Sequence, residues 1–403
     1  MKVLQINSVC GIGSTGRIAI DIHNILIDQG HESYIAYGRG LPKNCDDAIR
    51  IGTKIDNYTH VAKTRLLDKH GFGSKRATKE FVKEIKKIDP DIIHLHNIHG
   101  YYINIEILFN YLKEANKPVI WTLHDCWSFT GHCSHFDYIG CKKWKTGCFD
   151  CPQKQEYPKS VLIDNSEWNY NKKKEIFMGV DNMMLVTPSN WLSNLVGKSF
   201  LKDYRIEVIN NGIELSFFKP TDNEFRKKYE LDDKFIILGV ASIWTQSKGI
   251  NYFLELSTNL KEDEVIVLVG LSNKQLKEIP ENIIGISRTN NVEELADIYS
   301  SADIFVNPTL EDNFPTVNLE ALACGTPVIT FETGGSPESI NNKTGMVVKE
   351  RSSVKLYENI SNIRVSEKHS YIKECVDRAI KKYDRKLKYE EYISLYNNLV
   401  KSN

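Results

Sequence analysis

The chain of 403 residues carries 52 basic and 52 acidic side chains, so its formal net charge is zero and nothing in its charge favours a nucleic-acid partner. Its length is enough for two domains with separate cores. No run approaches 18 apolar residues, and the N-terminal segment is too short and too polar for a secretory signal, so we expect a cytoplasmic protein without a membrane-spanning helix.

A strand over residues 2–7 is followed by a glycine-rich loop and by an amphipathic helix over about residues 18–29. A strand, a glycine loop and a helix in this order form an arrangement that cradles phosphate groups. Gly13 and Gly16 complete the pattern G-x-G-x-x-G, which is weak evidence when it stands alone. Arg17 follows directly, either as a phosphate clamp or as a surface residue of the first helical turn.

Basic residues gather between His60 and Lys87, where nine lysines or arginines face three acids. Apolar residues alternate with them, among them Phe72, Phe81 and Ile85. Such a stretch predicts either a helix on an anionic membrane surface or a solvated helix face above a stripe of core residues. The sequence leaves both interpretations open.

Two buried strands, over residues 91–97 and 119–125, each carry a histidine next to their last residue. Ligands of open α/β sheets gather at the carboxyl ends of strands. His94 is expected in the core, whereas His96, Asn97 and His124 are candidates for the wall of a ligand site. Asp125 is expected either to orient the ring of His124 or to contact a substrate.

Five of the nine cysteines fall within residues 126–151. In a reducing cytosol this density favours metal binding over disulfides. Four thiolates would form a closed tetrahedral zinc site that pins a long loop; the alternative is reduced thiols without a metal. The candidate ligands are Cys133, Cys141, Cys148 and Cys151.

A strand over residues 183–187 with a serine-capped helix lies near the end of the first domain, and a strand over 235–241 begins a second Rossmann-like unit. Ser242 and Lys248 follow this strand. Further strands are expected over residues 265–270 and 303–307.

The segment from Thr309 to Ile340 combines loop, helix, strand and glycine loop. Pro315 suits the first turn of its helix, and Asp312 or Asn313 is expected to cap the free amides. A helix N-terminus that follows a parallel strand suits a phosphate group. Glu320, one turn further along, can accept hydrogen bonds from a ribose diol. The segment therefore predicts a nucleotide site, and a solvated helix glutamate is the alternative for Glu320.

These residues resemble the large family of retaining GT-B glycosyltransferases that includes sucrose synthase and bacterial phosphatidylinositol mannosyltransferases. That family carries two glutamates separated by seven residues. Here Asp312 takes the first position, with Glu311 beside it, and Glu320 takes the second. The family's diphosphate-binding lysine matches Lys248, whereas Ser242 or Ile243 stands where the family usually has an arginine.

The resemblance implies a GT-B fold, in which two Rossmann-like domains with parallel sheets face each other across a cleft and the last helix crosses back to the first domain. The expected domains are residues 1–205 for the acceptor, 206–378 for the donor, and 379–403 for the returning helix. The cysteine-rich loop over 126–151 lies where family members shape the acceptor site.

The resemblance also implies a metal-independent transfer of a sugar, with retention, from a UDP- or GDP-sugar to a saccharide or lipid-linked glycan. The setting would be cell-surface polysaccharide synthesis, at the inner face of the membrane. The implied catalytic residues are His124, Lys248, Asp312 and Glu320. The expected substrate-binding residues are Gly13, Gly16, Arg17, His96, Asn97, Ser242, Arg288, Thr289, Asn313, Phe314, Thr316 and Gly335.

Two other functions compete with this one. A GT-B-like scaffold could bind nucleotides without turnover, because Asp312 is a shortened acid and one arginine is missing. An NAD-linked oxidoreductase would need an acidic residue at the end of the second strand, over residues 31–37, and Gly38 follows it instead. Release of nucleoside diphosphate from a panel of donors would separate the three.

Overall fold

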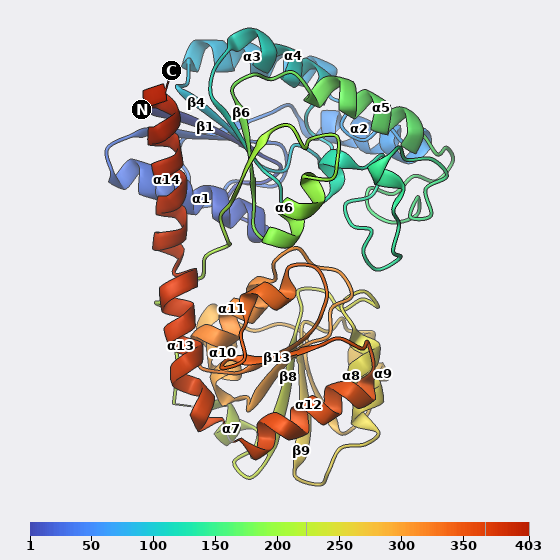
Figure 1. The fold of residues 1–403 in the computed structure, drawn as a ribbon, viewed down its shortest axis with the longest axis vertical. Coiled ribbons are helices and arrows are strands. Elements are labelled where there is room, and N and C mark those ends of the chain that lie inside the picture. Colours follow the sequence, from blue (N-terminus) through green and yellow to red (C-terminus); the bar gives the residue numbers. More distant parts are fainter. Residues whose placement is uncertain (223, 367, 403) are drawn as a thin grey trace. The chain divides into compact units, whose positions relative to one another are not determined.

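The computed structural model of the protein describes residues 1–222, 224–366 and 368–402, which form two compact units (Figure 1). Unit 1 comprises residues 1–209 and the segment from Tyr389 onward, and unit 2 comprises residues 210–388. Each unit is built around one parallel sheet. Within the described ranges, no helix combines the length and the apolar character needed to cross a bilayer.

The sheet of unit 1 has the strand order β3-β2-β1-β4-β5-β6-β7. All neighbouring strands are parallel. The order reverses between β1 and β4, so the carboxyl ends of these strands form a topological switch point, where α/β sheets bind ligands. The strands are β1 (Lys2–Asn7), β2 (Glu32–Tyr37), β3 (Ala48–Arg50), β4 (Ile92–Leu95), β5 (Val119–Thr122), β6 (Met183–Thr187) and β7 (Arg205–Val208).

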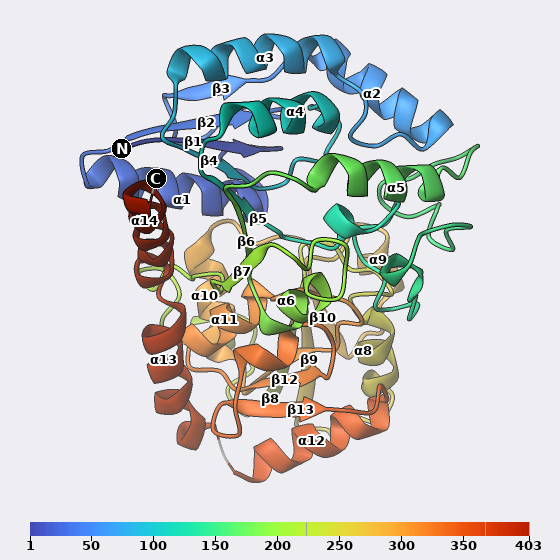
Figure 2. The same ribbon diagram turned by 45° about the horizontal axis from the view of Figure 1, so that its top comes forward.

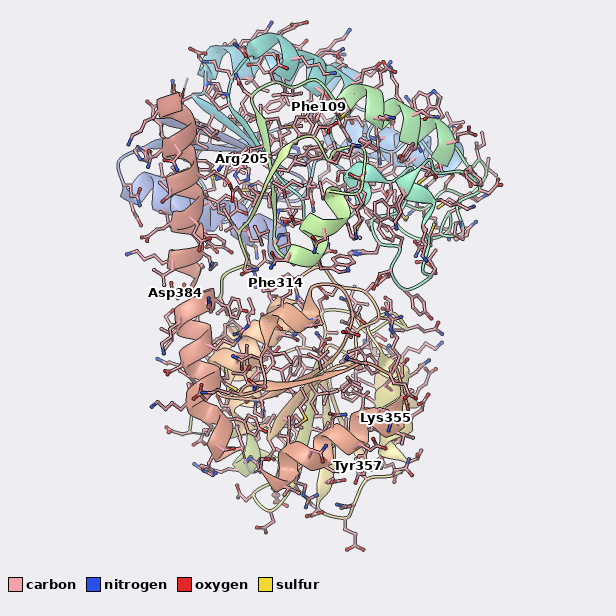
Figure 3. The ribbon with its side chains drawn as sticks, in the orientation of Figure 1. Phe109, Arg205, Phe314, Lys355, Tyr357 and Asp384 are labelled. Carbon is pink, nitrogen blue, oxygen red and sulfur yellow. The ribbon has the colours of Figure 1, made fainter. Side chains whose placement is uncertain are left out.

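Helices cover both faces of this sheet, as Figure 2 shows for α3 and α4 on one side and α1 on the other. Phe109 of α4 packs on Trp121 and Phe177 in the larger core (Figure 3). The opposite core joins α1, β1 and α14. The helices of unit 1 are α1 (Gly13–Asp28), α2 (Lys54–Leu67), α3 (Lys75–Ile88), α4 (Ile105–Ala115), α5 (Ser166–Phe177), α6 (Asn190–Val196) and most of α14 (Arg385–Ser402), with 3-10 turns η1 (Trp127–Phe129) and η2 (Lys143–Lys145).

The sheet of unit 2 has the order β10-β9-β8-β11-β12-β13, again parallel throughout, with its switch point between β8 and β11. Its strands are β8 (Phe235–Val240), β9 (Glu264–Val269), β10 (Ile283–Ile286), β11 (Ile304–Asn307), β12 (Val328–Phe331) and β13 (Gly345–Val348). Its helices are α7 (Glu224–Lys228), α8 (Ile250–Ser257), α9 (Gln275–Glu278), α10 (Val292–Ser301), α11 (Thr316–Ala323), η3 (Ser336–Ser339), α12 (Ser353–Val365) and α13 (His369–Tyr383).

The prediction of two Rossmann-like parallel sheets is confirmed, with three local corrections. The first helix begins at Gly13 rather than near residue 18, so Gly13 and Gly16 lie in its first turn. The returning helix, expected over residues 379–403, is divided between α13 and α14, because Asp384 leaves the helical conformation to form a β-bridge with Ile213. The short strands β3, β7 and β13 were not predicted; the three residues of β3 are too few to show a periodic pattern.

The basic stretch between His60 and Lys87 folds into the end of α2, a loop and α3. Phe72, Phe81 and Ile85 are buried in the core of unit 1, with at most 3% of each exposed. The core-stripe interpretation therefore holds for these three residues, and their side chains cannot also face a membrane.

Candidate active site

The candidate site of unit 1 is a small cavity at the carboxyl ends of β4 and β5. Residues 96–99 form one wall and residues 121–125 another, with Trp127 and Ser128 behind them. The cavity thus brings together three residues that the sequence predicted for a ligand site: His96, Asn97 and His124. His94 lies in the core as predicted, where its two ring nitrogens meet the hydroxyls of Tyr396 and Thr122.

The rings of His96 and His124 are stacked, and Nδ1 of His96 lies 3.1 Å from Nε2 of His124. His96 is 1% exposed, whereas His124 reaches partly into the open. Burial lowers the pKa of His96 well below its usual value and lowers the pKa of His124 to about 4. Both rings are therefore neutral at neutral pH, which suits His124 to hydrogen-bonding a hydroxyl rather than to acting as a fixed positive charge.

Asp125, expected either to orient the ring of His124 or to contact a substrate, meets two groups of unit 1. Its Oδ2 lies 2.9 Å from Nε2 of His99, and its Oδ1 accepts the backbone N–H of Trp127 at 2.9 Å. Burial alone would raise the pKa of Asp125, but the charge and hydrogen bond of His99 lower it to about 2. His99 in turn contacts the hydroxyl of Tyr157 at 3.1 Å, a pairing across 58 residues that no local pattern reveals.

The glycine segment after β1 is closely packed at one glycine and open at another. Gly16 is buried in the first turn of α1, and a Cβ there would come within 3.1 Å of the Val9 side chain and 3.2 Å of the Gly11 nitrogen. Gly13 adopts a φ of +65° that favours glycine, with open space beside it, and Arg17 is exposed. Gly16 therefore serves close packing, while Gly13 and Arg17 remain accessible.

The candidate site of unit 2 forms where the loops after β8 and β11 meet. Nζ of Lys248 lies 2.7 Å from Oδ2 of Asp312, with 38% and 20% of the two side chains exposed. The backbone N–H of Leu310 donates to the carbonyl of Ser247 at 2.7 Å, which holds the two loops together. Two of the four predicted catalytic residues thus form one ion pair at the switch point.

The glycine loop after β12 closes against the same place. A Cβ on Gly334 would lie 1.7 Å from the carbonyl oxygen of Asp312, and φ of Gly334 is +57°, so only glycine fits. The N–H of the neighbouring Gly335 donates to that carbonyl at 3.2 Å. Carboxyl ends of three adjacent strands, β8, β11 and β12, therefore converge here.

Helix α11 starts differently from the prediction. Its N-cap is Pro315, not Asp312 or Asn313, and a proline has no side-chain acceptor for the free amides. The carboxylate of Asp312 instead pairs with Lys248. The first helical residue is Thr316, and its side chain is partly exposed.

Glu320 lies one turn into α11, and its Oε2 accepts a hydrogen bond of 2.9 Å from the hydroxyl of Tyr299. Tyr299 is fully buried in α10, and burial raises its pKa well above the usual value, so it remains a hydroxyl donor. The tyrosine was not a predicted site residue, because its pattern in α10 is that of an ordinary core residue. The glutamate, in contrast, is partly exposed.

The other predicted residues of unit 2 are spread more widely. Phe314 is buried and packs on Tyr383, and its carbonyl accepts from Asn211, so in this structure it serves the core (Figure 3). Asn313 is also buried, and Ser242 is exposed just after β8. Arg288 and Thr289 follow β10, which β9 separates from β8 in the sheet.

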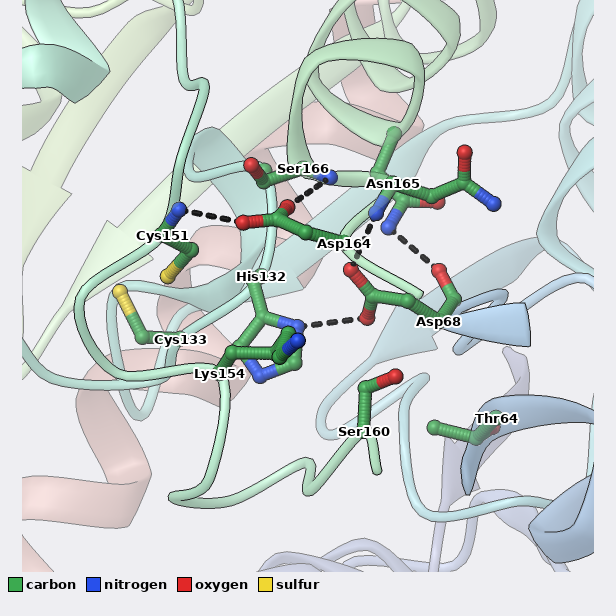
Figure 4. A network of polar contacts seen from close by, with 12 residues as sticks. Thr64, Asp68, His132, Cys133, Cys151, Lys154, Ser160, Asp164, Asn165 and Ser166 are labelled. Carbon is green, nitrogen blue, oxygen red and sulfur yellow. Dashed lines mark hydrogen bonds and ion pairs between the residues drawn. The ribbon is translucent and has the colours of Figure 1, made fainter. Parts of the chain in front are cut away.

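The four predicted zinc ligands, Cys133, Cys141, Cys148 and Cys151, all line one cavity of unit 1. The thiols of Cys133 and Cys151 are hydrogen-bonded and face each other in Figure 4. Sγ of Cys148 accepts the N–H of Gly131 at 3.1 Å. In the part of the chain that the structure describes, no three histidine, cysteine, aspartate or glutamate side chains already stand around one ion position. Binding of zinc would therefore require these cysteine side chains to adopt other rotamers.

Polar contacts anchor the cysteine loop to the rest of unit 1 (Figure 4). The side chains of His132 and Asp68 are both fully buried, and Nδ1 of His132 lies within hydrogen-bond distance, 2.6 Å, of Oδ1 of Asp68; Asp68 also accepts the N–H of Asn165 at 2.9 Å. Asp164 accepts the N–H of Cys151 at 2.5 Å. Buried Lys173 donates to the carbonyls of Trp127 and Thr130 at 2.7 and 3.1 Å.

Two protein-family profiles match the chain. The profile described as Glycosyltransferase Family 4 matches residues 15–217, and the one described as Glycosyl transferases group 1 matches residues 234–364. The first match covers half of the chain and falls almost wholly in unit 1; the second lies in unit 2.

Curated relatives and solved structures agree with these profiles. The chain is 26% identical to the putative colanic acid biosynthesis glycosyl transferase WcaC of Escherichia coli over 99% of its own length and 100% of that protein. It is 29% identical to an N,N'-diacetylbacillosaminyl-diphospho-undecaprenol alpha-1,3-N-acetylgalactosaminyltransferase of Campylobacter jejuni, over 50% of this chain and 57% of the other.

Among solved structures, sucrose-phosphate synthase from Thermosynechococcus elongatus superposes with a TM-score of 0.72 at 17% identity, covering both chains fully. Anabaena Alr3699/HepE in complex with UDP gives 0.70 at 13% identity, over 99% of this chain and 100% of the other. At these identities the likeness concerns the fold.

Proposed function

The chain belongs to Glycosyltransferase Family 4 and is a glycosyltransferase, and we propose that it transfers a sugar from a nucleoside diphosphate donor to a glycan hydroxyl with retention at the anomeric carbon. Because the chain belongs to a glycosyltransferase family, the alternative of an NAD-linked oxidoreductase is dropped. The donor base, the donor sugar and the stereochemical course belong to the proposal.

One observation carries the proposal most directly: the ion pair of Lys248 and Asp312 lies at the switch point of unit 2, beside the start of α11 and the glycine loop. A diphosphate leaving group develops negative charge as the sugar departs. The ammonium of Lys248 and the first free amides of α11 supply positive charge at that place. Glu320, one turn along α11, is placed to accept hydrogen bonds from the ribose.

The relatives suggest the substrates. HepE is solved with UDP, UDP with glucose, and UDP-glucose. The E. coli relative is named for colanic acid biosynthesis and the C. jejuni relative for transfer to a diphospho-undecaprenol acceptor. We therefore favour a UDP-sugar over a GDP-sugar, and a lipid-linked or growing glycan acceptor of cell-surface polysaccharide synthesis.

The experiment is a panel of UDP- and GDP-sugars, each offered with lipid-linked and free saccharide acceptors, with release of nucleoside diphosphate as the readout. We expect turnover with a UDP-sugar, and NMR of the product should show the same anomeric configuration as the donor. Binding of UDP without turnover on any donor would favour the scaffold alternative. A product with the opposite anomeric configuration would refute retention but not sugar transfer.

We also propose that unit 1 associates with an anionic membrane surface through an apolar patch. The patch consists of residues that are 40% to 65% exposed: Leu66, Leu67, Val161, Leu162, Ile163 and Trp168. The two segments lie side by side, because the N–H of Val161 donates to the carbonyl of Arg65 at 2.7 Å. Arg65, Lys69 and Lys159 supply positive charge around it, with Nζ of Lys69 4.5 Å from the ring of Trp168.

Leu66→Asp combined with Leu162→Asp is expected to abolish sedimentation of the protein with phosphatidylglycerol vesicles, because two carboxylates would enter an anionic interface. The matched control is Val354→Asp on α12, a residue that is also 64% exposed. It should bind as the unchanged protein does. Equal sedimentation with neutral and anionic vesicles, or none with either, would remove the proposal.

We further propose that the cysteine loop binds one structural zinc ion, as the sequence suggests. Support comes from the four thiols around one cavity and from a loop that, between residues 131 and 164, contains the 3-10 helix η2 but neither an α-helix nor a strand. Purified protein should contain about one zinc per chain, and a chelator should lower its Tm. Cys148→Ser should lose the metal while Cys126→Ser keeps it. Elemental analysis without zinc would end the idea.

A further inference from the structure

Two cysteines outside the cysteine loop meet at the carboxyl edge of the unit 1 sheet. Cys10 lies in the loop after β1 and Cys45 in the loop after β2, and their thiols are hydrogen-bonded to each other. Cys10 is fully buried among side chains of α1 and β2, and Cys45 packs on the same cluster while it stays partly exposed. No spacing in the sequence indicates this pair, because it forms between two loops.

The backbones of the two loops are fixed against each other beside the pair. The N–H of Lys43 donates to the carbonyl of Cys10 at 3.3 Å, and the N–H of Arg39 donates to the carbonyl of Ser8 at 2.9 Å. Gly11, with φ of +68°, leaves no room for a Cβ, which would lie 2.2 Å from the carbonyl oxygen of Lys43. The fold therefore holds the two thiols together, and a bond between their sulfurs needs little movement of either loop.

A buried histidine stands on the other side of Cys45. Nε2 of His23 lies 3.9 Å from Sγ of Cys45, and Nδ1 of His23 lies 2.9 Å from Oγ of Ser33. In the tautomer that donates from Nδ1 to the serine, the ring presents a lone pair at Nε2 to the thiol. The histidine is thus placed to receive a proton from Cys45.

The hydrogen bond between the thiols also affects how the pair ionises. The bond from Cys45 lowers the pKa of Cys10 despite burial, and the same bond raises the pKa of Cys45. After the first ionisation, the two sulfurs share the proton that remains. A peroxide oxidises the thiolate form of cysteine, and Cys45 is the sulfur of the pair that is partly exposed.

We propose that Cys10 and Cys45 are a redox-sensitive pair that hydrogen peroxide converts into an intramolecular disulfide, with His23 receiving the proton of Cys45. The Cys45 thiolate attacks one peroxide oxygen: the S–O bond forms, the O–O bond breaks, and the departing hydroxide takes the proton from His23 to become water. The sulfur of Cys10 then attacks the Cys45 sulfenic acid. The S–S bond forms, the S–O bond breaks, and the second hydroxide leaves as water with the proton of Cys10. Two thiols lose two electrons, and one peroxide is reduced to two waters.

The product is a reversible covalent link at the carboxyl edge of the sheet. Cys10 directly precedes the glycine segment in which Gly13 and Arg17 are accessible. A bond to Cys45 limits the movement of that segment without covering it, and a thiol reductant restores the free pair by exchange.

The test is peptide mapping of the full chain after treatment with hydrogen peroxide and alkylation of the thiols that remain free. In a digest made without reductant, we expect a peptide pair joined through Cys10 and Cys45, which disappears after dithiothreitol. Recovery of both cysteines in alkylated form would overturn the proposal. So would a Cys45 that stops at the sulfenic or sulfinic acid while Cys10 stays free. The measurement needs no sugar donor, so its outcome is independent of the proposed glycosyl transfer.

Three variants separate the roles of the residues. Cys10→Ser removes the second thiol, so Cys45 should accumulate as a sulfenic acid that dimedone traps. His23→Gln should slow the loss of the Cys45 thiol by about 100-fold, the lower end of what a positioned acid–base group contributes. The matched control is Cys375→Ser, because Cys375 is also a fully buried thiol, in α13, and its variant should form the disulfide at the unchanged rate.

Each variant can contradict one part of the proposal. A Cys10→Ser protein without trapped Cys45 would show that Cys45 is not the sulfur oxidised first. A His23→Gln protein that is oxidised at the unchanged rate would refute the role of the histidine. A Cys375→Ser protein that no longer forms the disulfide would show that the reaction is not confined to the pair.

Discussion

Lys248→Ala is expected to lower kcat by about 100- to 1000-fold, the range found when one preorganised group that stabilises developing charge is removed. Lys248 is the cation that the structure places at the switch point of unit 2, 2.7 Å from Asp312. Its loss removes the attraction for the diphosphate and also leaves the Asp312 carboxylate to repel it. Steady-state release of nucleoside diphosphate measures the effect.

A double variant separates these two contributions. Lys248→Ala with Asp312→Asn should recover part of the lost rate, because the repelling carboxylate is neutralised. The control is Lys355→Ala on α12, where Lys355 pairs with Glu358 at 2.8 Å on the surface of unit 2. It should retain full activity. If the Lys248→Ala variant turns over within about threefold of the rate of the unchanged protein, Lys248 does not contribute to the active site.

Glu320→Ala should weaken UDP binding by about 10- to 100-fold, since each hydrogen bond to a charged group contributes about 1.5–3 kcal/mol. The carboxylate is held in place by the hydroxyl of Tyr299 at 2.9 Å, so little entropy is lost when a ribose diol binds. The fold should survive, because Glu320 is partly exposed. Isothermal titration with UDP gives the affinity.

The role at the ribose is tested by the ligand rather than by the protein alone. With UDP lacking its ribose 2′ and 3′ hydroxyls, Glu320→Ala and the unchanged protein should bind equally, because the interaction is already absent. Tyr299→Phe should show a smaller loss with UDP and none with the dideoxy ligand. Glu358→Ala is the matched control. An equal loss with both ligands would place Glu320 away from the ribose.

Sequence patterns were sufficient where one residue's role depends on its near neighbours. The apolar runs that form β1, β6, β8 and β11 are short and buried on both faces. Parallel strands of this kind can be recognised in a sequence as nearly continuous apolar runs. Gly325, with φ of +80°, follows the last turn of α11, where an αL position at a helix end favours glycine. The segment from Asp312 to Glu320 likewise carries its motif within nine consecutive residues.

The candidate site needed the tertiary structure wherever partners are far apart in the chain. The sequence predicted Asp312 as a helix cap, but its carboxylate accepts a hydrogen bond from Lys248, 64 residues away. A charge-assisted hydrogen bond of this kind is stronger than one to a neutral backbone amide. The sequence also offered Asp125 as a partner for His124 or for a substrate, and no spacing indicated that His99 meets the same carboxylate.

Amino-acid order by itself determined the two parallel sheets and the ends of strands at which ligand-binding side chains gather, since strand burial and helix punctuation are local properties. Which side chains meet at those ends was decided only by folding. Gln5 reaches His96, and Tyr299 reaches Glu320, because sheet order and helix packing bring them within hydrogen-bond distance. Hydrogen bonds act over about 3 Å, and no spacing along a chain encodes such proximity.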